Sequence, residues 1–265
     1  MSIIQVQNLY KSFGGLRAID HCSFSVEENS ITGLVGPNGA GKTTMFDLIN
    51  GLMMPDEGHI FIKNHSVTHW PTHKRAKLGL ARTFQAVRIF PQLTVIDNVV
   101  VALKAHPEKL LQSFLPYKKL RLRLKKEAME HLEMVGIAEK AHMEASELSF
   151  GQQKLLELAR CIATNADIFL LDEPAAGVNP TLLKTITKLI LELHKKGKTL
   201  FIVEHNMPFL MSLAQKVIVL DFGQELAVGT PEEIQNNPRV LEAYLGRKRE
   251  NDKVEHAKQK GLIVF

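Results

Sequence analysis

The sequence contains few cysteines and no long apolar run. Its two cysteines, Cys22 and Cys161, lie far apart and lack the spacing of a metal site. We therefore expect two reduced thiols, as in a cytosolic protein, and no disulfide framework. No apolar stretch approaches the roughly 18 residues that a membrane-spanning helix needs. The chain does not open with a basic segment followed by an apolar run, so we expect no secretory signal peptide. These absences predict a protein that is soluble or peripheral to a membrane.

Length and composition leave room for one large domain. The chain has 265 residues, and its 45% hydrophobic content is enough for a sizeable core. We find no internal repeat and no low-complexity linker. The formal net charge of +5 is compatible with a nucleic-acid partner, with an anionic membrane surface, or with neither.

The clearest basic segment covers residues 118–126, which include six lysines and arginines. Apolar residues recur through this segment at helical spacing, so it predicts an amphipathic helix. A solvated helix face is the simplest explanation of the charge. A surface close to lipid headgroups is the alternative.

Several short apolar segments along the chain have the patterns of β-strands. Residues 3–9 and 22–26 have the pattern of antiparallel strands, with a turn between them at Gly14 and Gly15. Continuous apolar runs suit strands that are covered on both faces, as in a parallel sheet. Four such runs occur, at residues 31–35, 168–171, 200–203 and 217–220.

Helical patterns lie between these runs. Residues 181–196 place their aliphatic side chains in one stripe, and Gly197 stands at the expected end. The strand–helix–strand order implies an α/β fold with right-handed crossovers. Residues 97–147 lack strand patterns and look mostly helical. We therefore expect a mainly parallel core sheet, an N-terminal antiparallel β subdomain, and a helical subdomain inserted at about residues 88–165.

Residues 36–43 read Gly-Pro-Asn-Gly-Ala-Gly-Lys-Thr, between a predicted strand and a predicted helix. The glycines allow backbone N–H groups to close around phosphates, and the helix that follows adds its positive end. Lys42 can reach the β- and γ-phosphates, and the hydroxyl of Thr43 can ligate Mg²⁺. The pattern should arise by chance in only about one chain of this size in a hundred. The sequence therefore predicts a phosphate-binding loop (P-loop) rather than a plain Gly-rich turn.

Two carboxylates, Asp172 and Glu173, follow the apolar run at residues 168–171. Parallel sheets place ligands at the carboxyl edge of their strands, where both side chains should lie. Asp172 can hold Mg²⁺ directly or through water, and Glu173 can polarise an attacking water. The alternative is an acidic pair that caps a helix. His205 follows another run and should reach the same edge, where it could donate to the γ-phosphate, although a lone histidine is more often structural.

Residues 148–153, which we call the signature segment, read Leu-Ser-Phe-Gly-Gln-Gln. Ser149 and Gln152 fit a capping box at the start of a helix. A capped helix N-terminus with Gly151 at its tip is also an anion site. A single chain supplies no second phosphate for it, which suggests that it faces the ATP of a partner subunit.

Three further residues carry weaker signals. Asn179 precedes a proline and reads as the N-cap of the helix that follows. Phe13, beside a Gly-Gly turn, could stack on adenine, although a position in the core is the commoner role for such a residue. Gln85 has no signal of its own.

Together these segments resemble the ATP-binding cassette (ABC) ATPase family, over residues 1–246. The signature segment carries most of the specificity, because many P-loop proteins share only the P-loop and the acidic strand. The resemblance implies ATP and Mg²⁺ as cofactors and a P-loop ABC ATPase fold. It assigns catalysis to Glu173, His205, Gln85 and Lys42, and Mg²⁺ binding to Thr43, Gln85 and Asp172. The implied ATP contacts are Phe13, Ala18, Gly36, Pro37, Asn38, Gly39, Ala40, Gly41, Lys42, Thr43 and Thr44. The implied contacts to the partner's ATP are Ser149, Phe150, Gly151 and Gln152, with Asn179 in the D-loop.

The resemblance also implies partners and a location. Two ATP-binding subunits would sandwich two ATP molecules, and their closure would drive transmembrane permease subunits between inward and outward states. The second subunit is expected to be a different chain, with a homodimer as the alternative. A periplasmic solute-binding protein would act indirectly, and no nucleic acid is expected. The implied location is the cytoplasmic face of the inner membrane.

Two departures from the common family pattern point to a subgroup. Phe150 replaces a glycine of the signature segment, and Asn179 replaces an aspartate of the D-loop. Both are similar to the ATP-binding subunits of branched-chain amino-acid importers, which implies uptake of those amino acids. The alternatives are the ATPase of a lipopolysaccharide export complex and an importer of another small polar solute. An ABC protein bound to nucleic acid has only the basic charge in its favour. Residues 247–265 lie beyond the resemblance, and we expect a frayed tail, with docking of its apolar end on a partner as the alternative.

Overall fold

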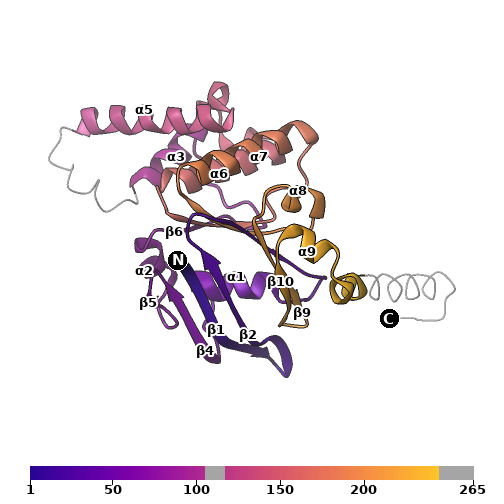
Figure 1. The fold of residues 1–265 in the computed structure, drawn as a ribbon. Helices are drawn as coiled ribbons and strands as arrows, with labels where there is room; N and C mark the ends of the chain where they lie inside the picture. The colour runs from indigo at the N-terminus through magenta and orange to yellow at the C-terminus, as the bar shows by residue number, and fades with distance from the viewer. Residues whose placement is uncertain (105–116, 245–265) are drawn as a thin grey trace, which may run out of the picture.

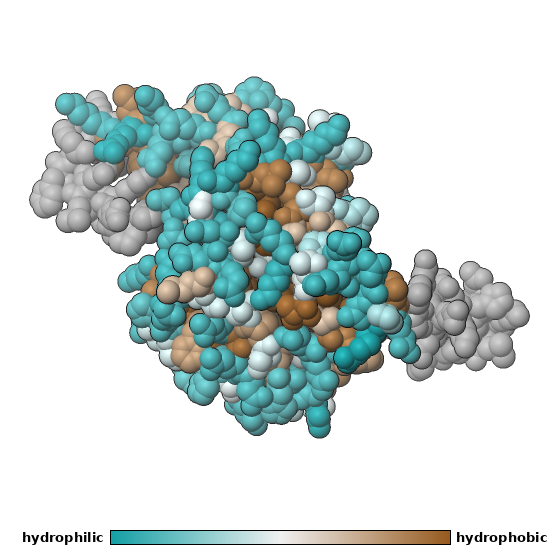
Figure 2. Space-filling view, in the orientation of Figure 1, coloured by the Kyte–Doolittle hydropathy of each residue, from teal (hydrophilic) through white to brown (hydrophobic). Residues whose placement is uncertain are grey.

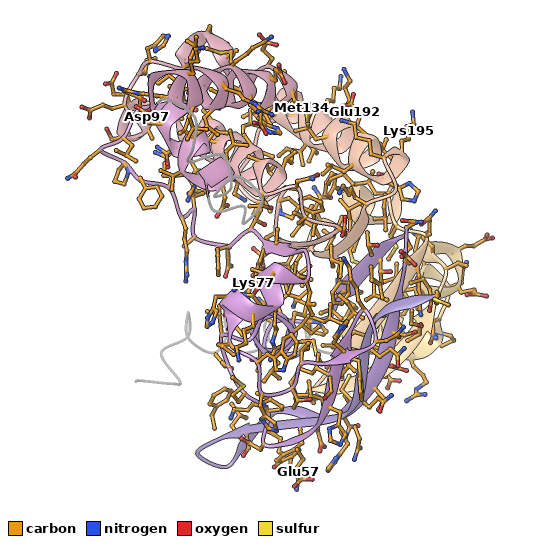
Figure 3. The ribbon with its side chains drawn as sticks, turned by 90° about the vertical axis from the view of Figure 1, so that its left-hand side faces the viewer. Glu57, Lys77, Asp97, Met134, Glu192 and Lys195 are labelled. Carbon is orange, nitrogen blue, oxygen red and sulfur yellow. The ribbon has the colours of Figure 1, made fainter. Side chains whose placement is uncertain are left out.

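The computed structural model describes residues 1–104 and 117–244. Figure 1 shows helices α3, α5, α6 and α7 at one end of the molecule and the antiparallel strands at the other, with α1 (Lys42–Asn50) between them. Figure 3 shows the same separation from the side, with Glu57 at the strand end and Asp97 and Met134 at the helical end. The helices at that end are α3 (Val95–Lys104), α5 (Tyr117–Val135), α6 (Phe150–Ala163) and α7 (Pro180–Lys195).

The N-terminal strands form a four-stranded antiparallel sheet in the order β2-β1-β4-β5. The predicted hairpin is confirmed, although its strands are longer than expected. Gly14 and Gly15 form its turn with φ of 52° and 90°, in the left-handed region that favours glycine. The strands are β1 (Ser2–Phe13), β2 (Leu16–Glu27), β4 (Glu57–Ile62) and β5 (His65–Ser66).

The central sheet has six strands in the order β10-β9-β3-β8-β7-β6. The five strands from β9 to β6 pair in parallel, and only β10 is antiparallel, which confirms the mainly parallel sheet. All four predicted apolar runs are strands here, whereas β6 and β10 were not predicted. The strands are β3 (Ile31–Val35), β6 (Leu80–Arg82), β7 (Ile168–Asp172), β8 (Thr199–Val203), β9 (Lys216–Asp221) and β10 (Gln224–Gly229).

The inner strands β3, β7 and β8 are buried along their whole length because each face of the central sheet has its own core. In β7, Ile168 and Leu170 join a core with α1 and the antiparallel sheet. Phe169 and Leu171 point the other way, into a core with α3, α5, α6 and α7. Alternation along each strand therefore divides its side chains between two cores, and the carboxyl ends of β3, β7 and β8 lie at one edge.

The predicted basic helix is confirmed as α5. Its apolar stripe, which includes Leu124, Ala128 and Leu132, is buried against the helical core, while Arg121 and Arg123 are exposed. Shorter elements complete the fold. They are α2 (Thr72–Lys77), two 3-10 turns at Ala138–Lys140 and Ala145–Glu147, α8 (Met207–Met211) and α9 (Pro231–Gln235).

Helix α1 ends against a buried arginine. Gly51 follows the last residue of the helix with φ of 79°, in the left-handed region that favours glycine. The guanidinium of Arg75, which is fully buried, donates to the carbonyl oxygens of Leu48 (2.6 Å) and Ile49 (2.8 Å). Burial lowers the pKa of Arg75 to about 10. This side chain therefore satisfies carbonyl groups that the helix end leaves without a partner.

Polar residues cover most of the face shown in Figure 2, and hydrophobic residues gather near its middle. None of the helices in residues 1–104 and 117–244 has the length and apolar character that a bilayer span requires. The predicted tail at residues 247–265 lies outside the described residues.

Both cysteines are buried free thiols. Burial raises the pKa of Cys22 to about 12 and also raises the pKa of Cys161. Because the thiolate is the reactive form, we expect a thiol reagent at pH 8 to label neither cysteine of the native protein within minutes. Both should react after unfolding in guanidinium, as counted with a chromogenic disulfide reagent. Rapid labelling of the native protein would contradict the burial of these thiols.

Candidate nucleotide-binding and hydrolysis site

The P-loop connects β3 to α1. Gly39 and Gly41 have φ of 77° and 98°, which favour glycine. A Cβ atom on Gly41 would lie 2.4 Å from the carbonyl oxygen of Ala18, so this glycine also lets the backbone of β2 approach the loop. The buried Lys42 Nζ donates to the carbonyl oxygens of Gly36 (2.7 Å) and Pro37 (2.9 Å). The segment thus has the strand–loop–helix context that a phosphate-binding loop requires, with its lysine inside the turn.

Glu173 follows the end of β7 in an unusual conformation. Its φ of 49° is in the left-handed region, which is uncommon for a glutamate. Two hydrogen bonds hold it there: its N–H donates to the carbonyl of Val203 (2.9 Å), and its carbonyl accepts from Lys154 Nζ (2.7 Å). These contacts from β8 and α6 fix the backbone from which the carboxylate projects.

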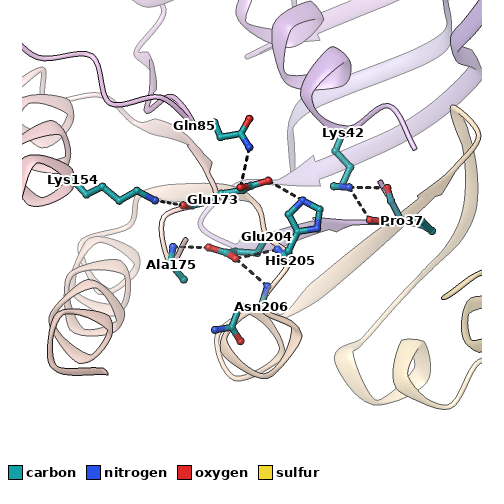
Figure 4. Close-up of polar contacts among 10 residues, drawn as sticks. Pro37, Lys42, Gln85, Lys154, Glu173, Ala175, Glu204, His205 and Asn206 are labelled. Atoms are coloured by element: carbon teal, nitrogen blue, oxygen red, sulfur yellow. Dashed lines mark hydrogen bonds and ion pairs between the residues drawn. The ribbon is translucent and has the colours of Figure 1, made fainter. Parts of the chain in front are cut away.

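Three of the predicted catalytic side chains meet at this carboxylate. Nε2 of His205 lies 2.8 Å from Oε1 of Glu173. Nε2 of Gln85 donates to Oε2 of Glu173 at 3.2 Å. Figure 4 shows Glu173 and His205 between Lys154 on one side and Lys42 on the other. The structure therefore gathers residues from four separate segments beside the P-loop.

Asp172 ends β7 in a buried ion-pair network. Its Oδ2 accepts from Arg82 Nη2 at 3.0 Å, and Arg82 Nη1 donates to Asp47 Oδ1 at 2.6 Å. Burial raises the pKa of Asp172, and the hydrogen bond and charge of Arg82 oppose this shift. Oδ1 of Asp172 is buried and makes no hydrogen bond to the residues that the structure describes. One carboxylate oxygen is thus held by Arg82, and the other is an unsatisfied acceptor.

The segment after β6 runs alongside β7 and delivers Gln85. The N–H of Thr83 donates to the carbonyl of Leu170 (3.0 Å), and its hydroxyl accepts from the N–H of Asp172 (3.1 Å). These bonds extend the pairing of the two strands past the end of β6. Gln85 therefore reaches Glu173 because the segment that carries it continues from β6, which is registered against β7.

The predicted capping box begins α6. The N–H of Gln152 donates to the hydroxyl of Ser149 (3.4 Å), and the N–H of Ser149 donates to Oε1 of Gln152 (3.0 Å). Phe150 is half exposed, and a Cβ atom on Gly177 would lie 2.9 Å from its ring. A Cβ atom on Gly151 would lie 2.3 Å from Leu182 of α7. The tip of α6 is therefore packed against Gly177, in the D-loop at residues 175–180, and against α7.

One face of α6 is hydrogen-bonded to the loops of the site. Lys154 bonds the carbonyl of Glu173, and the buried Glu157, one turn further, accepts from the N–H groups of Phe84 (3.3 Å) and Arg88 (3.2 Å). Arg160, another turn on, donates to the carbonyl of Arg88. Burial lowers the pKa of Lys154 and raises that of Glu157. Charged residues at helical spacing on this face of α6 thus bind the backbone on both sides of Gln85, at Phe84 and at Arg88.

Glu204 is a second buried carboxylate beside the site. It accepts backbone N–H groups from Ala175, His205 and Asn206, as Figure 4 shows. Burial raises its pKa, and these three donors oppose the shift. Sequence reasoning missed four buried charged residues at the site, although each stands out as a charge within or beside an apolar run: Arg82, Lys154, Glu157 and Glu204.

Three further predicted ATP contacts, Phe13, Thr43 and Thr44, lie at the end of β1 and in the first turn of α1. Phe13 ends β1 with 45% of its surface exposed, so the core position considered for it is wrong. Nζ of Lys11 lies 5.5 Å from the centre of its ring. Thr43 is exposed and Thr44 is partly buried in the first turn of α1. Phe13 and Thr43 are therefore accessible to a ligand.

Asn179 caps α7, as predicted, because its Oδ1 accepts from the N–H of Leu182 at 2.9 Å. Asn179→Ala should lower the free energy of unfolding by about 1 kcal/mol. Asn179→Asp should retain the cap and add a favourable negative charge at the helix N-terminus. Equilibrium unfolding in guanidinium measures both variants. Equal stability of the alanine variant and the parent chain would contradict the role of this cap.

Comparisons with known proteins agree with this geometry. A family model described as ABC transporter matches residues 19–176, and one described as branched-chain amino acid ATP-binding cassette transporter matches residues 224–250. The chain is 41% identical to the high-affinity branched-chain amino acid transport ATP-binding protein LivG of Salmonella typhimurium, over 92% of this chain and 98% of that protein. BraF of Pseudomonas aeruginosa, which has the same description, is 40% identical over the same shares. A solved nucleotide-free ATP-binding cassette from an ABC transporter matches with a TM-score of 0.80 at 32% identity, over 92% of this chain and 99% of that one. The chain therefore belongs to the ABC transporter family, as one of its ATP-binding and ATP-hydrolysing cassettes.

Proposed function

We propose that this chain powers the uptake of branched-chain amino acids as the ATP-hydrolysing subunit of an ABC importer. The observation that carries the hydrolytic role is the carboxylate of Glu173, held between Gln85 and His205 beside the P-loop. The solute class rests on the relatives, which are branched-chain amino acid transport proteins by description, and on the family model at residues 224–250. Phe150 and Asn179 support the same subgroup over lipopolysaccharide export.

The residues around Glu173 divide the work of hydrolysis. Lys42 and the N–H groups of the P-loop bind the β- and γ-phosphates, exchanging the carbonyl partners of Lys42 for phosphate oxygens. Glu173 orients a water and takes its proton as the water oxygen bonds to the γ-phosphorus. The bond from that phosphorus to the ADP oxygen breaks in the same step. His205, aligned by Glu173, donates to a γ-phosphate oxygen and stabilises its growing charge.

The donor set fits a magnesium ion. Thr43, Asp172 and Gln85 offer the oxygen ligands that Mg²⁺ prefers, and the unsatisfied Oδ1 of Asp172 supports this assignment. When bound, Mg²⁺ neutralises charge on the β- and γ-phosphate oxygens. Arg82 keeps Asp172 in place from the opposite oxygen.

The tip of α6 supports an assembly of two cassettes. Ser149 and Phe150 are exposed at a capped helix N-terminus, which favours an anion. In the proposed assembly each signature segment binds the ATP held by the other subunit's P-loop, with Asn179 in the seam. The second cassette is proposed to be a different chain. Permease subunits complete the importer, a periplasmic binding protein delivers the solute, and this chain lies at the cytoplasmic face of the inner membrane.

Affinity capture tests the proposal. The Glu173→Gln variant, loaded with ATP, would be recovered from detergent-solubilised native membranes and its partners identified. We expect two permease subunits and a second cassette. The same complex purified with the parent chain, placed in liposomes, should take up radiolabelled leucine only with ATP and binding protein. Recovery of lipopolysaccharide-export subunits would move the function to that alternative. Ribosomes or nucleic acid without membrane protein would overturn the transport role.

A further inference from the structure

Glu204 joins two segments that belong to different parts of the chain. Its Oε1 accepts from the N–H of Ala175 at 2.6 Å, in the segment that follows Glu173. Its Oε2 accepts from the N–H groups of His205 (3.1 Å) and Asn206 (3.2 Å), at the end of β8. The side chain is almost fully buried, with 2% of its surface exposed. One carboxylate therefore binds the backbone on both sides of the contact between Glu173 and His205.

A carboxylate is the side chain that this position needs. All three groups facing it are N–H donors, and an ionised carboxylate accepts at both oxygens. Bonds from charged acceptors to backbone N–H groups are shorter and stronger than neutral ones, which agrees with the distance to Ala175. A buried anion also needs compensation, and the ammonium of Lys154 supplies an attractive charge nearby.

We infer that Glu204 is a positioning residue that clamps the Glu173 segment to the His205 segment and so maintains the contact between those two side chains. The inference rests on the proposed hydrolytic role of Glu173 and His205. Glu204 itself is buried behind them and bonds only backbone groups among its described contacts. Its effect on hydrolysis is therefore indirect, through the alignment of His205 with Glu173.

Glu204→Gln tests the hydrogen bonds of Glu204 without changing the size of its side chain. An amide of the same size accepts at its oxygen only, and its NH₂ group faces an N–H donor on the other side. One of the two segments must therefore lose its bond. Misalignment of a catalytic pair by about 1 Å costs up to about 100-fold in rate. We expect the kcat for ATP to fall by about 10- to 100-fold, with the Kd for ATP within about twofold, because the P-loop is untouched.

A double-mutant cycle identifies the route of this effect. If Glu204 acts by maintaining the contact between His205 and Glu173, substituting Glu204 should have little further effect on kcat in a variant that already lacks the His205 side chain. In a His205→Ala background, Glu204→Gln should lower kcat by no more than about threefold. The measurements use the full chain in the complex purified with Glu173 intact, with phosphate release for kcat and a fluorescent ATP analogue for Kd. Asp167→Asn, an exposed carboxylate at the opposite end of β7, is the matched control and should keep the parent kcat.

A second readout does not depend on turnover. In ¹⁵N-histidine spectra, the Nε2 resonance of His205, assigned from the alanine variant, should move in Glu204→Gln towards the value of a histidine without a carboxylate partner. If that variant does not fold, Glu204→Asp, which keeps both acceptors on a shorter side chain, should show an intermediate kcat and the same non-additivity. Fully additive losses, or an unmoved His205 resonance, would overturn the inference. An absence of ATP hydrolysis by the parent complex would instead overturn the proposed function.

Discussion

Glu173→Gln should lower the kcat for ATP by about 100- to 1,000-fold, because it removes the group that accepts the proton of the attacking water. The amide has nearly the size of the carboxylate, and its backbone contacts to Val203 and Lys154 do not depend on the side chain. The affinity for ATP should therefore stay within a few-fold of that of the parent chain. Phosphate release gives kcat, and titration with a fluorescent ATP analogue gives Kd.

Two further results decide how that loss is interpreted. The control Asp167→Asn should leave both constants unchanged, because its lysine partners lie far from the catalytic edge of the sheet. Thermal melting of Glu173→Gln should match that of the parent chain. Full activity of the glutamine variant would remove Glu173 from the mechanism, and a large increase in Kd would indicate a role in binding instead.

Arg82→Met should lower the free energy of unfolding by about 3–5 kcal/mol. Only 3% of the Arg82 side chain and 2% of the Asp172 side chain are exposed, so the substitution leaves a buried carboxylate without its counter-charge. Asp47 loses its 2.6 Å partner at the same time. A domain of this size changes its Tm by about 2–4 °C per kcal/mol, so a loss of about 3–5 kcal/mol should lower Tm by about 6–20 °C.

An exposed ion pair of equal length provides the control for Arg82. Lys63 and Asp167 are also 2.6 Å apart, but their side chains are 34% and 51% exposed. Lys63→Met should therefore cost no more than about 1 kcal/mol. Adding Asp172→Asn to Arg82→Met should restore part of the lost stability, because the unpaired charge is removed. A loss near that of the Lys63 variant would show that the buried network contributes little.

The sequence predicted those parts of the fold that depend on neighbouring residues. The apolar runs of β3, β7, β8 and β9 are continuous because both faces of the sheet are covered, and this pattern is visible without the structure. The caps of α6 and α7 are equally local, since Ser149 and Asn179 bond N–H groups three residues away. The family and the mainly parallel sheet followed from these features and are confirmed.

The contacts that support the site join residues far apart in the sequence, so patterns among neighbouring residues could not predict them. β6 is only three residues long, so its apolar pattern is too short to indicate a strand. Arg82 meets Asp47 and Asp172 only because that short strand pairs with β7 and packs beside α1. Glu204 likewise is visible as a charge after the apolar run of β8, but its role depends on Ala175, which lies 29 residues earlier. Motifs supply the reacting groups locally, and distant residues hold them in place.

Helix α6 has a consequence for how two such chains work together. Its N-terminus carries the signature segment, and its buried face holds the backbone of Glu173 and both flanks of Gln85 in the same chain. A helix is stiff along its length, so a displacement imposed at its tip by one nucleotide is carried to the loops that surround the other. In the proposed sandwich, each α6 therefore connects the two ATP sites mechanically. In that assembly, cleavage of one ATP alters the arrangement of catalytic residues around the other. Hydrolysis at the two sites is then coupled.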